Sequence, residues 1–504
     1  MLLILFILLP SILLLLLKKL PIIFFHGQTK NTKQLLPGPW KLPFLGSIHQ
    51  LLTREQTHHR FHRLSKQYGD LFSIKLGGVD FVVASSPCSA RAVLNTQDHV
   101  LASRPTLLAV EVIGYNSGGI GFSPYGQYWR QLRKICTQEL LSSRKVKALG
   151  FIRYEEGERL VEKIGSAGGA PVNLTEMFMA VSNIQITRTA FGKECGRSRG
   201  RFLSAMKETL KLLPMLRVAD LFPSMSFLIS CLDGSSFQMK RLRREMDAVL
   251  DEIIEEHVMR GEDGGEMEED LVDVLLRIQR KGELQVPLTM DNVKAVILDM
   301  LVAATETTSN TMCWVMSELM RHPNIMSKTQ LEIREAFRGK TRLEDNDISG
   351  LRYLHLVIME TLRMHPPLPL LLPRTCSEAT ELLGFHIPAK ARVVVNVWAI
   401  GRDPMIWKDP ESFWPERFEE NSRDFKGNNY EYIPFGSGRR VCPGITFAMA
   451  GMELFLGLLL NHFDWKIPAC DGGLEELDME EEFDGTTRRK KDLCLIAVPH
   501  EILG

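Results

Sequence analysis

The segment Pro434-Phe-Gly-Ser-Gly-Arg-Arg-Val-Cys-Pro-Gly444 places a single cysteine in a turn rich in glycine and arginine. Its glycines permit turns that other residues cannot make, and its prolines fix the backbone. Arg439 and Arg440 add positive charge beside Cys442, which favours the thiolate. The apolar stretch from Ile445 predicts a helix whose first free N–H groups lie near the sulfur. A pre-formed thiolate predicts a soft metal as ligand. The alternative, a buried structural cysteine, is disfavoured by these neighbours.

The same segment resembles the haem-binding signature of the cytochrome P450 family, F-x-x-G-x-R-x-C-x-G. The residues that match it without a gap are Phe435, Gly438, Arg440, Cys442 and Gly444. The resemblance implies that the cofactor is haem b and that Cys442 is the axial ligand of its iron. Cytochromes P450 are an established example of haem held by a cysteine thiolate.

The 504-residue chain has the composition of an ordinary globular protein, with 45% hydrophobic and 24% charged residues. Its formal net charge is zero, so its overall charge gives no reason to expect nucleic-acid binding. Nine cysteines lie along it without paired spacing, at positions 88, 136, 195, 231, 313, 376, 442, 470 and 494. This odd, dispersed set is typical of a reducing compartment and argues against a disulfide framework or a zinc cluster.

Residues 1–25 are expected to anchor the chain in a membrane. Between Leu2 and Leu17 only Pro10 and Ser11 interrupt a run of Leu, Ile and Phe, and two lysines follow. A helix rises about 1.5 Å per residue, so this run is slightly short for a bilayer core and the span is expected to continue past the lysines. A cleaved signal peptide is the alternative, but no basic residue precedes the run and no small-residue cleavage site follows it. Lysines on the C-terminal flank predict that the rest of the chain faces the cytosol.

Residues 26–46 are expected to form a hinge, and residues 47–504 one large domain, predominantly α-helical with small β-sheets. The stretch Leu36-Pro-Gly-Pro-Trp-Lys-Leu-Pro-Phe-Leu-Gly46 is stiff and proline-rich, and it resembles the hinge of microsomal P450s. Two alternating runs, at 71–77 and 80–85, predict a hairpin. From about Pro87 onward the patterns are mostly helical, and residues 391–398 return to strand character.

One acid stands among several hydroxyl groups inside a long predicted helix. The mostly apolar stretch from Val293 to Val302 runs into Ala303-Ala304-Thr305-Glu306-Thr307-Thr308-Ser309. A buried carboxylate needs partners or a function, whereas a polar face that meets solvent explains this segment equally well by itself. The segment resembles the (A/G)-G-x-(D/E)-T-T pattern of the helix that crosses the haem in P450s. The resemblance implies that Glu306 and Thr307 are the acid–alcohol pair that delivers protons during oxygen activation.

Ala304 departs from this pattern, because the family has glycine at its position. Its methyl group is expected to point into the space for O2 or substrate. Oxygen activation is therefore expected to be retained in a narrowed pocket.

A carboxylate and a guanidinium lie three residues apart in Glu360-Thr-Leu-Arg363, on one face of a predicted helix. An exposed pair of this kind contributes little, but the neighbouring residues are apolar. The pair matches the E-x-x-R motif of P450s, and Pro415-Glu-Arg-Phe418 matches the segment whose arginine completes the network. The resemblance implies that Glu360, Arg363 and Arg417 form a structural ion-pair network that holds the haem-binding core.

The two propionates of haem require arginine and indole donors. Trp129-Arg-Gln-Leu-Arg133 matches the W-x-x-x-R helix of P450s, and Arg374 and Arg440 match other positions that contact propionates. Any one of these arginines could by itself be a surface residue. Together, in the order of the family, they imply that Trp129, Arg133, Arg374 and Arg440 bind the cofactor.

Between Arg130 and Lys147 the sequence has six basic residues and one acid, Glu139. A solvated helix face is the simpler interpretation. The resemblance implies instead a docking surface for the acidic flavoprotein NADPH–cytochrome P450 reductase, which charge attraction would guide.

The candidate walls of a substrate pocket are aliphatic, which predicts an apolar substrate. They comprise the loop from Ser103 to Gly121 and seven further residues, Leu298, Val302, Ala303, Ala304, Leu370, Leu371 and Leu372.

The resemblance extends over nearly the whole chain and is strongest to plant microsomal P450s. It implies a single-pass protein of the endoplasmic reticulum membrane whose catalytic domain faces the cytosol. Such a monooxygenase uses O2 and NADPH electrons from the reductase to oxidise an apolar specialised metabolite, such as a terpenoid. Two alternatives remain: a haem-thiolate enzyme that rearranges peroxides without a reductase, and a haem-binding membrane protein without turnover. The Glu306–Thr307 pair and the basic stretch disfavour the first of these.

Overall fold

The computed structural model describes residues 34–192, 199–212, 217–262, 269–340, 345–419, 423–470, 473–474 and 477–500. The chain divides into two compact units, Met1–Leu35 and Leu36–Gly504, and the description below concerns the second. The predicted anchor, residues 1–25, and residues 26–33 of the predicted hinge lie outside the described residues. Within the described residues one helix, Ile445–His462, is long and apolar enough to cross a membrane. That helix is mostly buried, as a core helix of a soluble domain would be.

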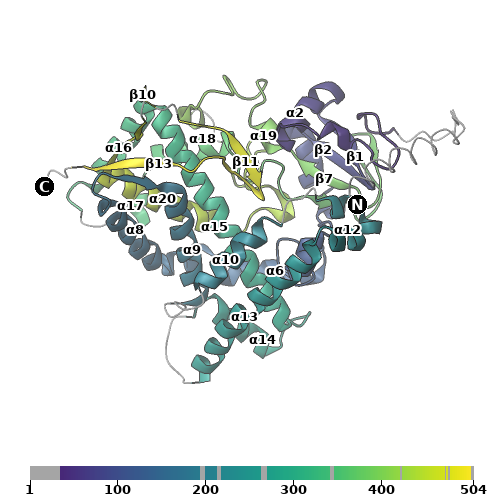
Figure 1. Cartoon of the computed structure of the whole chain (residues 1–504), viewed down its shortest axis with the longest axis horizontal. Helices are drawn as coiled ribbons and strands as arrows, with labels where there is room; N and C mark the ends of the chain where they lie inside the picture. Colours follow the sequence, from purple (N-terminus) through teal and green to yellow (C-terminus); the bar gives the residue numbers. More distant parts are fainter. Residues whose placement is uncertain are drawn as a thin grey trace, which may run out of the picture. The chain divides into compact units, whose positions relative to one another are not determined.

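Helices make up most of the second unit, which confirms the predicted fold class (Figure 1). The long helices are α2 (Thr57–Tyr68), α6 (Gln127–Ile135), α8 (Gly150–Gly165), α9 (Leu174–Phe191), α10 (Arg199–Leu210), α13 (Ser235–Glu262), α14 (Leu271–Lys281), α15 (Met290–Arg321), α16 (Pro323–Phe337), α18 (Arg352–Met364) and α20 (Ile445–His462). The short helices are α3 (Pro87–Arg91), α4 (Asp98–Leu101), α5 (Leu108–Val112), α7 (Ser143–Ala148), α11 (Val218–Leu221), α12 (Ser226–Leu232), α17 (Asp345–Ser349) and α19 (Val397–Ile400). Single turns of 3₁₀- or π-helix are η1 (Ile48–Gln50), η2 (Ala92–Thr96), η3 (Cys136–Leu140), η4 (Pro223–Met225), η5 (Pro415–Phe418) and η6 (Gly438–Arg440).

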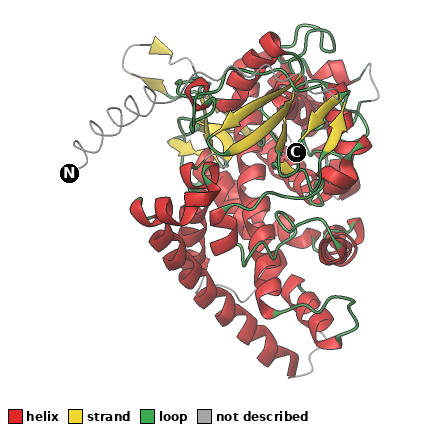
Figure 2. Cartoon of the chain, turned by 90° about the vertical axis from the view of Figure 1, so that its right-hand side faces the viewer, coloured by secondary structure: helices red, strands yellow, loops and turns green. Residues whose placement is uncertain are grey.

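The strands form small sheets, which Figure 2 shows in yellow beside the helices. The largest sheet has the order β1 (Leu71–Leu76), β2 (Val79–Ala84), β7 (Arg392–Val395) and β4 (Arg374–Thr375). A second has the order β3 (Pro171–Asn173), β13 (Cys494–Pro499) and β8 (Phe463–Lys466). Three pairs complete the set: β5 (Thr380–Leu382) with β6 (Phe385–Ile387), β9 (Ala469–Cys470) with β10 (Gly473–Leu474), and β11 (Glu481–Asp484) with β12 (Thr486–Arg489).

The largest sheet contains both strand regions predicted from the sequence. β1 and β2 form the predicted antiparallel hairpin, with Leu71 opposite Ala84. The predicted strand at 391–398 is shorter, because β7 ends at Val395. Asn396 then begins α19, where its side-chain oxygen accepts the N–H of Ala399 at 3.1 Å. An asparagine at this position favours a helix start over a longer strand.

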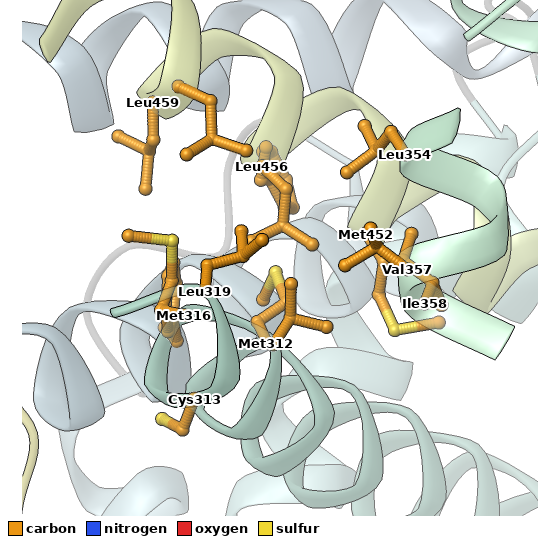
Figure 3. Close-up of a cluster of buried hydrophobic side chains, with 14 of the residues drawn as sticks. Met312, Cys313, Met316, Leu319, Leu354, Val357, Ile358, Met452, Leu456 and Leu459 are labelled. Atoms are coloured by element: carbon orange, nitrogen blue, oxygen red, sulfur yellow. The ribbon is translucent and has the colours of Figure 1, made fainter. Parts of the chain in front are cut away.

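α15 is the long central helix of the unit and begins at a capping box. The Thr289 hydroxyl accepts the N–H of Asn292 at 3.2 Å, and the Asn292 side chain accepts the N–H of Thr289 at 3.0 Å. The C-terminal half of α15 packs against α18 and α20 through buried aliphatic and methionine side chains (Figure 3). The cluster drawn there includes Met312, Cys313, Met316, Leu319, Leu354, Val357, Ile358, Met452, Leu456 and Leu459. It joins the helix that carries Glu306 to the helix that follows Cys442.

Candidate active site

A cavity of about 390 Å³ brings together residues that lie far apart in the sequence. Its wall contains both predicted catalytic residues and all five predicted cofactor residues, namely Glu306, Thr307, Trp129, Arg133, Arg374, Arg440 and Cys442. They come from α15, α6, β4, η6 and the loop before α20. A concave, largely apolar site with a few converging polar groups is typical of a cofactor and substrate pocket.

The Cys442 loop has the tight backbone that its sequence predicts. Gly438 has a φ of +67°, and a Cβ there would lie 2.0 Å from the carbonyl oxygen of Leu94. Only glycine combines that conformation with so close an approach. The N–H of Cys442 donates to the carbonyl of Phe435 at 3.0 Å. The N–H of Gly444 points at the cysteine Sγ at 3.4 Å, and α20 starts at the next residue.

The positive charge near the sulfur comes from a different arginine than the sequence suggests. The side chain of Arg439 bonds Asp98 and Tyr125, and that of Arg440 donates to backbone carbonyls, including that of Ala102 at 2.8 Å. Burial raises the pKa of the Cys442 thiol, while the Gly444 N–H and the Arg133 charge act to lower it. Burial therefore has a larger effect on the pKa of this thiol than the neighbouring N–H group and charge have. A bound metal ion deprotonates its thiol ligand outright, so this buried sulfur suits an iron ligand.

Four arginines lie close together in the cavity wall, namely Arg104, Arg133, Arg374 and Arg440. Burial, and then the charges of Arg374 and Arg133, lower the pKa of Arg440 to about 9. Burial and the charges of Arg440 and Arg374 likewise hold the pKa of Arg104 well below its ordinary value. The compensating acid, Asp98, ion-pairs with Arg374. Positive charge therefore exceeds negative charge here, which fits a ligand with two carboxylates such as haem.

Sequence reasoning assigned no cofactor role to Arg104, although it named the loop that contains it. The guanidinium of Arg104 donates to the carbonyls of Gly121, Leu372 and Pro373 at 3.0, 2.7 and 2.9 Å. The signal that could have identified Arg104 was its charge in a mostly apolar part of the sequence. The turn between β11 and β12 was missed entirely, although Phe483 and Thr486 line the cavity.

The hydroxyl cluster of α15 lies inside the protein and not on a solvent-facing helix surface. Thr305, Glu306 and Thr308 are buried, so the alternative of a solvated polar face does not hold. Thr307 lines the cavity, and its hydroxyl donates to the carbonyl of Ala303 at 2.7 Å. Such a bond to the preceding turn is the usual resting arrangement of a threonine inside a helix.

The structure places most of the predicted aliphatic wall around the same cavity. The predicted wall residues that line it are Leu298, Val302, Ala303, Ala304, Leu371 and Leu372. Leu370 differs, because it is buried in a core cluster with Phe72 and Phe81 of the largest sheet. The chain turns at Leu371, which has a φ of +52°, so successive leucines face different surroundings.

Glu360, Arg363 and Arg417 form a buried ion-pair network outside the cavity wall. Arg363 donates to both carboxylate oxygens of Glu360, at 2.7 and 2.8 Å, and Arg417 donates to one at 2.9 Å. The remaining N–H groups of both arginines bond backbone carbonyls, among them Pro410 and Lys408. The three side chains join α18 to η5 and to the loop before it.

Comparison with known proteins places this geometry in one family. The sequence profile described as cytochrome P450 matches residues 36–491. Premnaspirodiene oxygenase of Hyoscyamus muticus is 47% identical over 95% of each chain. For 5-epiaristolochene 1,3-dihydroxylase of Nicotiana tabacum the identity is 44% over 95% of each chain. Tabersonine 3-oxygenase of Catharanthus roseus is 44% identical over 94% of each chain.

A solved structure shows the same fold. It is a zebra fish cytochrome P450 with progesterone, which matches with a TM-score of 0.76 at 25% identity. The match covers 89% of this chain and 100% of the other.

Proposed function

The chain belongs to the cytochrome P450 family, whose members are haem-thiolate monooxygenases, and we propose that it oxidises a terpenoid hydrocarbon at a membrane. The observation that carries this proposal is the cavity itself. One cavity joins the cysteine loop, the arginine cluster, the Glu306–Thr307 pair and an aliphatic wall.

We assign the following roles to the residues of this chain. The Cys442 sulfur would hold the iron, and Arg104, Arg133, Arg374 and Arg440 would hold the propionates. The Trp129 ring would line the cofactor pocket, because its one N–H donates to the carbonyl of Ile120. Haem, when bound, supplies the one-electron and O2 chemistry.

Two residues of α15 are placed to handle protons. Both Glu306 and Thr307 line the cavity. Thr307 Oγ1 can pass a proton into the cavity when its bond to the Ala303 carbonyl opens. The aliphatic side chains of the wall carry no proton donor, so we assign proton delivery to Glu306 and Thr307.

The substrate class rests on the wall and on the relatives. Two relatives are named for oxidation of premnaspirodiene and 5-epiaristolochene, and a third for tabersonine. The part of the wall made by Leu298, Val302, Ala303, Leu371 and Leu372 offers no charge to an ionised substrate. It therefore favours a hydrocarbon over a charged molecule.

A substrate-feeding experiment with microsomes tests this function. Microsomes that carry this chain and a plant NADPH–cytochrome P450 reductase receive premnaspirodiene or 5-epiaristolochene under isotopically labelled O2. We expect an oxygenated product that contains the label and requires NADPH. Product without NADPH or label would indicate peroxide rearrangement, and absence of any product from a wider terpenoid panel would indicate a haem protein without this activity.

Removing the methyl group of Ala304 tests the narrowed pocket. Ala304 lines the cavity at the position where the family has glycine. We expect Ala304→Gly to change the product ratio, or the product formed per NADPH consumed, by about fourfold, since one methyl-sized group is worth about 0.8 kcal/mol of burial. Unchanged products and coupling at normal haem content would show that the methyl group does not reach the substrate.

We also propose that an exposed apolar surface lies against the membrane. It flanks the turn between β1 and β2, where Gly77 bonds the carbonyl of Leu45 and Gly78 bonds that of Leu221. The large exposed side chains on either side are Trp40, Phe44, Leu45, Val218, Met225, Phe227, Leu228 and Leu232. So many exposed apolar groups on adjacent segments mark an interaction surface, and they support contact with a membrane. That this membrane is the endoplasmic reticulum, with the catalytic domain facing the cytosol, is proposed from the resemblance to microsomal P450s and from the lysines that follow the apolar N-terminal run.

The reductase would dock on a smaller basic surface than the sequence suggests. Of the six basic residues, Arg130, Lys134, Arg144 and Lys147 are exposed. Arg133 lines the cavity, and the Lys145 ammonium donates to the carbonyl of Glu269.

Charge reversal tests this docking surface. We expect Lys134→Glu with Arg144→Glu to lower reductase-supported turnover roughly tenfold at low salt, because charge steering is lost. Added salt should slow the unchanged protein and have little effect on the variant. Turnover driven by peroxide instead of the reductase should be equal in both, and Lys466→Glu on β8 serves as a matched control. Equal salt dependence in all proteins would contradict this docking surface.

A further inference from the structure

The loop between α5 and α6 forms part of the cavity wall and is held from the cofactor side through its carbonyl groups. The indole N–H of Trp129 and the guanidinium of Arg440 donate to the carbonyl of Ile120, at 3.0 and 3.1 Å. Arg104 donates to the carbonyl of Gly121 at 3.0 Å. Three residues that we place at the cofactor therefore fix one edge of this loop.

Two N–H groups of the same loop bond a carboxylate on α15. The N–H of Gly121 donates to Asp299 Oδ2 at 2.8 Å, and the N–H of Ile120 bonds the same carboxylate. The backbone at Gly119 approaches so closely that a Cβ there would lie 2.1 Å from Oδ2. A side chain at 119 would therefore displace the carboxylate or the loop, and the carboxylate sits among backbone groups of the loop.

Asp299 stands in a wall that is otherwise poorly suited to an acid. It lines the cavity beside Leu298 and Met300. Burial raises the pKa of its carboxyl group to about 6, although the two loop N–H groups act to lower it. The nearby Tyr128 and Cys136 are acids whose own pKa values the Asp299 charge raises, so they add no positive charge. Burying a charged carboxylate costs free energy unless the group is hydrogen-bonded. The hydrogen bonds from the loop N–H groups offset this cost and explain why an acid lies here.

We propose that Asp299 is a positioning residue that holds residues 118–121 against α15 and thereby selects which carbon of the substrate is oxidised. The loop contributes Ile120, Gly121 and Phe122 to the cavity wall. If the Asp299 bonds are lost, the loop keeps its bonds from the cofactor side and the bond of the Tyr128 hydroxyl to the Gly118 carbonyl. This part of the cavity wall can then shift relative to α15. The selection of substrate carbon rests on the proposed function, whereas the loop contact is a property of this chain.

Hydrogen–deuterium exchange of the haem-loaded protein tests the loop contact directly. In Asp299→Ala we expect the amides of residues 118–122 to exchange roughly tenfold faster or more, because two N–H groups lose a charged acceptor. Asp299→Asn keeps the shape and one acceptor oxygen, so it should restore part of the protection. The control is Asp291→Asn on the same helix, an exposed acid 3.5 Å from Arg243. Unchanged exchange in Asp299→Ala would overturn the proposal.

A second pair of variants distinguishes loss of this contact from a general folding defect in Asp299→Ala. Gly119→Ala should displace the loop in the unchanged protein, because the new methyl group meets the carboxylate. In the Asp299→Ala background the same change should have a smaller effect, since the carboxylate is gone. Equal effects in both backgrounds would overturn the proposed contact.

The binding of haem ligands and the ratio of products then show whether the contact between Asp299 and the loop affects the substrate site. Imidazole should bind the haem iron equally in all variants. The bulky clotrimazole should bind Asp299→Ala at least about threefold more weakly or more tightly, because its rings touch the wall. With any terpenoid that the unchanged protein oxidises, the product ratio should also change. If exchange and clotrimazole binding respond while no terpenoid is oxidised by any protein, the proposed function fails and the positioning role stands. Unchanged clotrimazole binding and products, with faster exchange, would overturn the selective role.

Discussion

Replacement of Cys442 by serine is expected to abolish monooxygenase activity. The sulfur lies at the cavity wall, where a Gly444 N–H points at it from 3.4 Å. A serine hydroxyl is a hard and weakly acidic ligand, so it cannot replace a thiolate on iron. Loss of a mere supporting contact at a metal site typically costs roughly 10–100-fold, and loss of the ligand itself should cost more. The measurement is the absorption spectrum of the reduced protein with CO, whose long-wavelength band requires a thiolate ligand.

A control variant and a contradicting outcome complete this test. Cys494→Ser changes an exposed cysteine on β13 and should leave the spectrum and turnover unchanged. A normal thiolate spectrum from Cys442→Ser would move the ligand assignment to another cysteine. Buried Cys136, whose pKa burial raises to about 12, would be the first to examine by the same substitution.

Most features of the fold and the site that could be predicted from the sequence lie in contiguous motifs. The Cys442 loop, the start of the following helix at Ile445 and the Glu306–Thr307 pair are local patterns whose geometry depends on near neighbours. The hairpin at 71–84 is local in the same way. Such features can be predicted because turn residues and hydrophobic periodicity act over a few positions.

The other features of the site depend on contacts between residues that are far apart in the sequence, and no local pattern encodes these contacts. Arg104 joins the cofactor arginines only because the chain brings it to Arg374 and Arg440. Asp299 is a single polar residue in an apolar stretch until Gly121 approaches it from 178 positions away. Leu370 is aliphatic like its neighbours, and its place in the core depends on the turn at Leu371. Residue type alone does not distinguish a pocket wall from a core.

Glu360→Ala is expected to destabilise the folded protein by about 3–5 kcal/mol and to cause loss of haem. Glu360 is fully buried, and it is the common acceptor for Arg363 and Arg417. It also accepts the N–H of Trp414 at 2.9 Å. The substitution leaves two guanidinium groups inside the protein without their shared carboxylate. Thermal unfolding and the haem-to-protein ratio measure the effect.

The physical cause can be separated from simple loss of side-chain volume. Glu360→Gln keeps the volume and one acceptor oxygen but removes the charge, so a defect nearly as large as that of alanine would identify the unpaired guanidinium groups as the cause. Glu480→Ala breaks an exposed ion pair with Lys490 at 2.6 Å and should leave thermal unfolding and haem content unchanged. Full haem content and unchanged unfolding in Glu360→Ala would mean that the arginines hold α18 and η5 through carbonyls such as those of Pro410 and Lys408 alone. The buried charges of this core would then be neutralised by backbone dipoles, and the carboxylate would be dispensable for the fold.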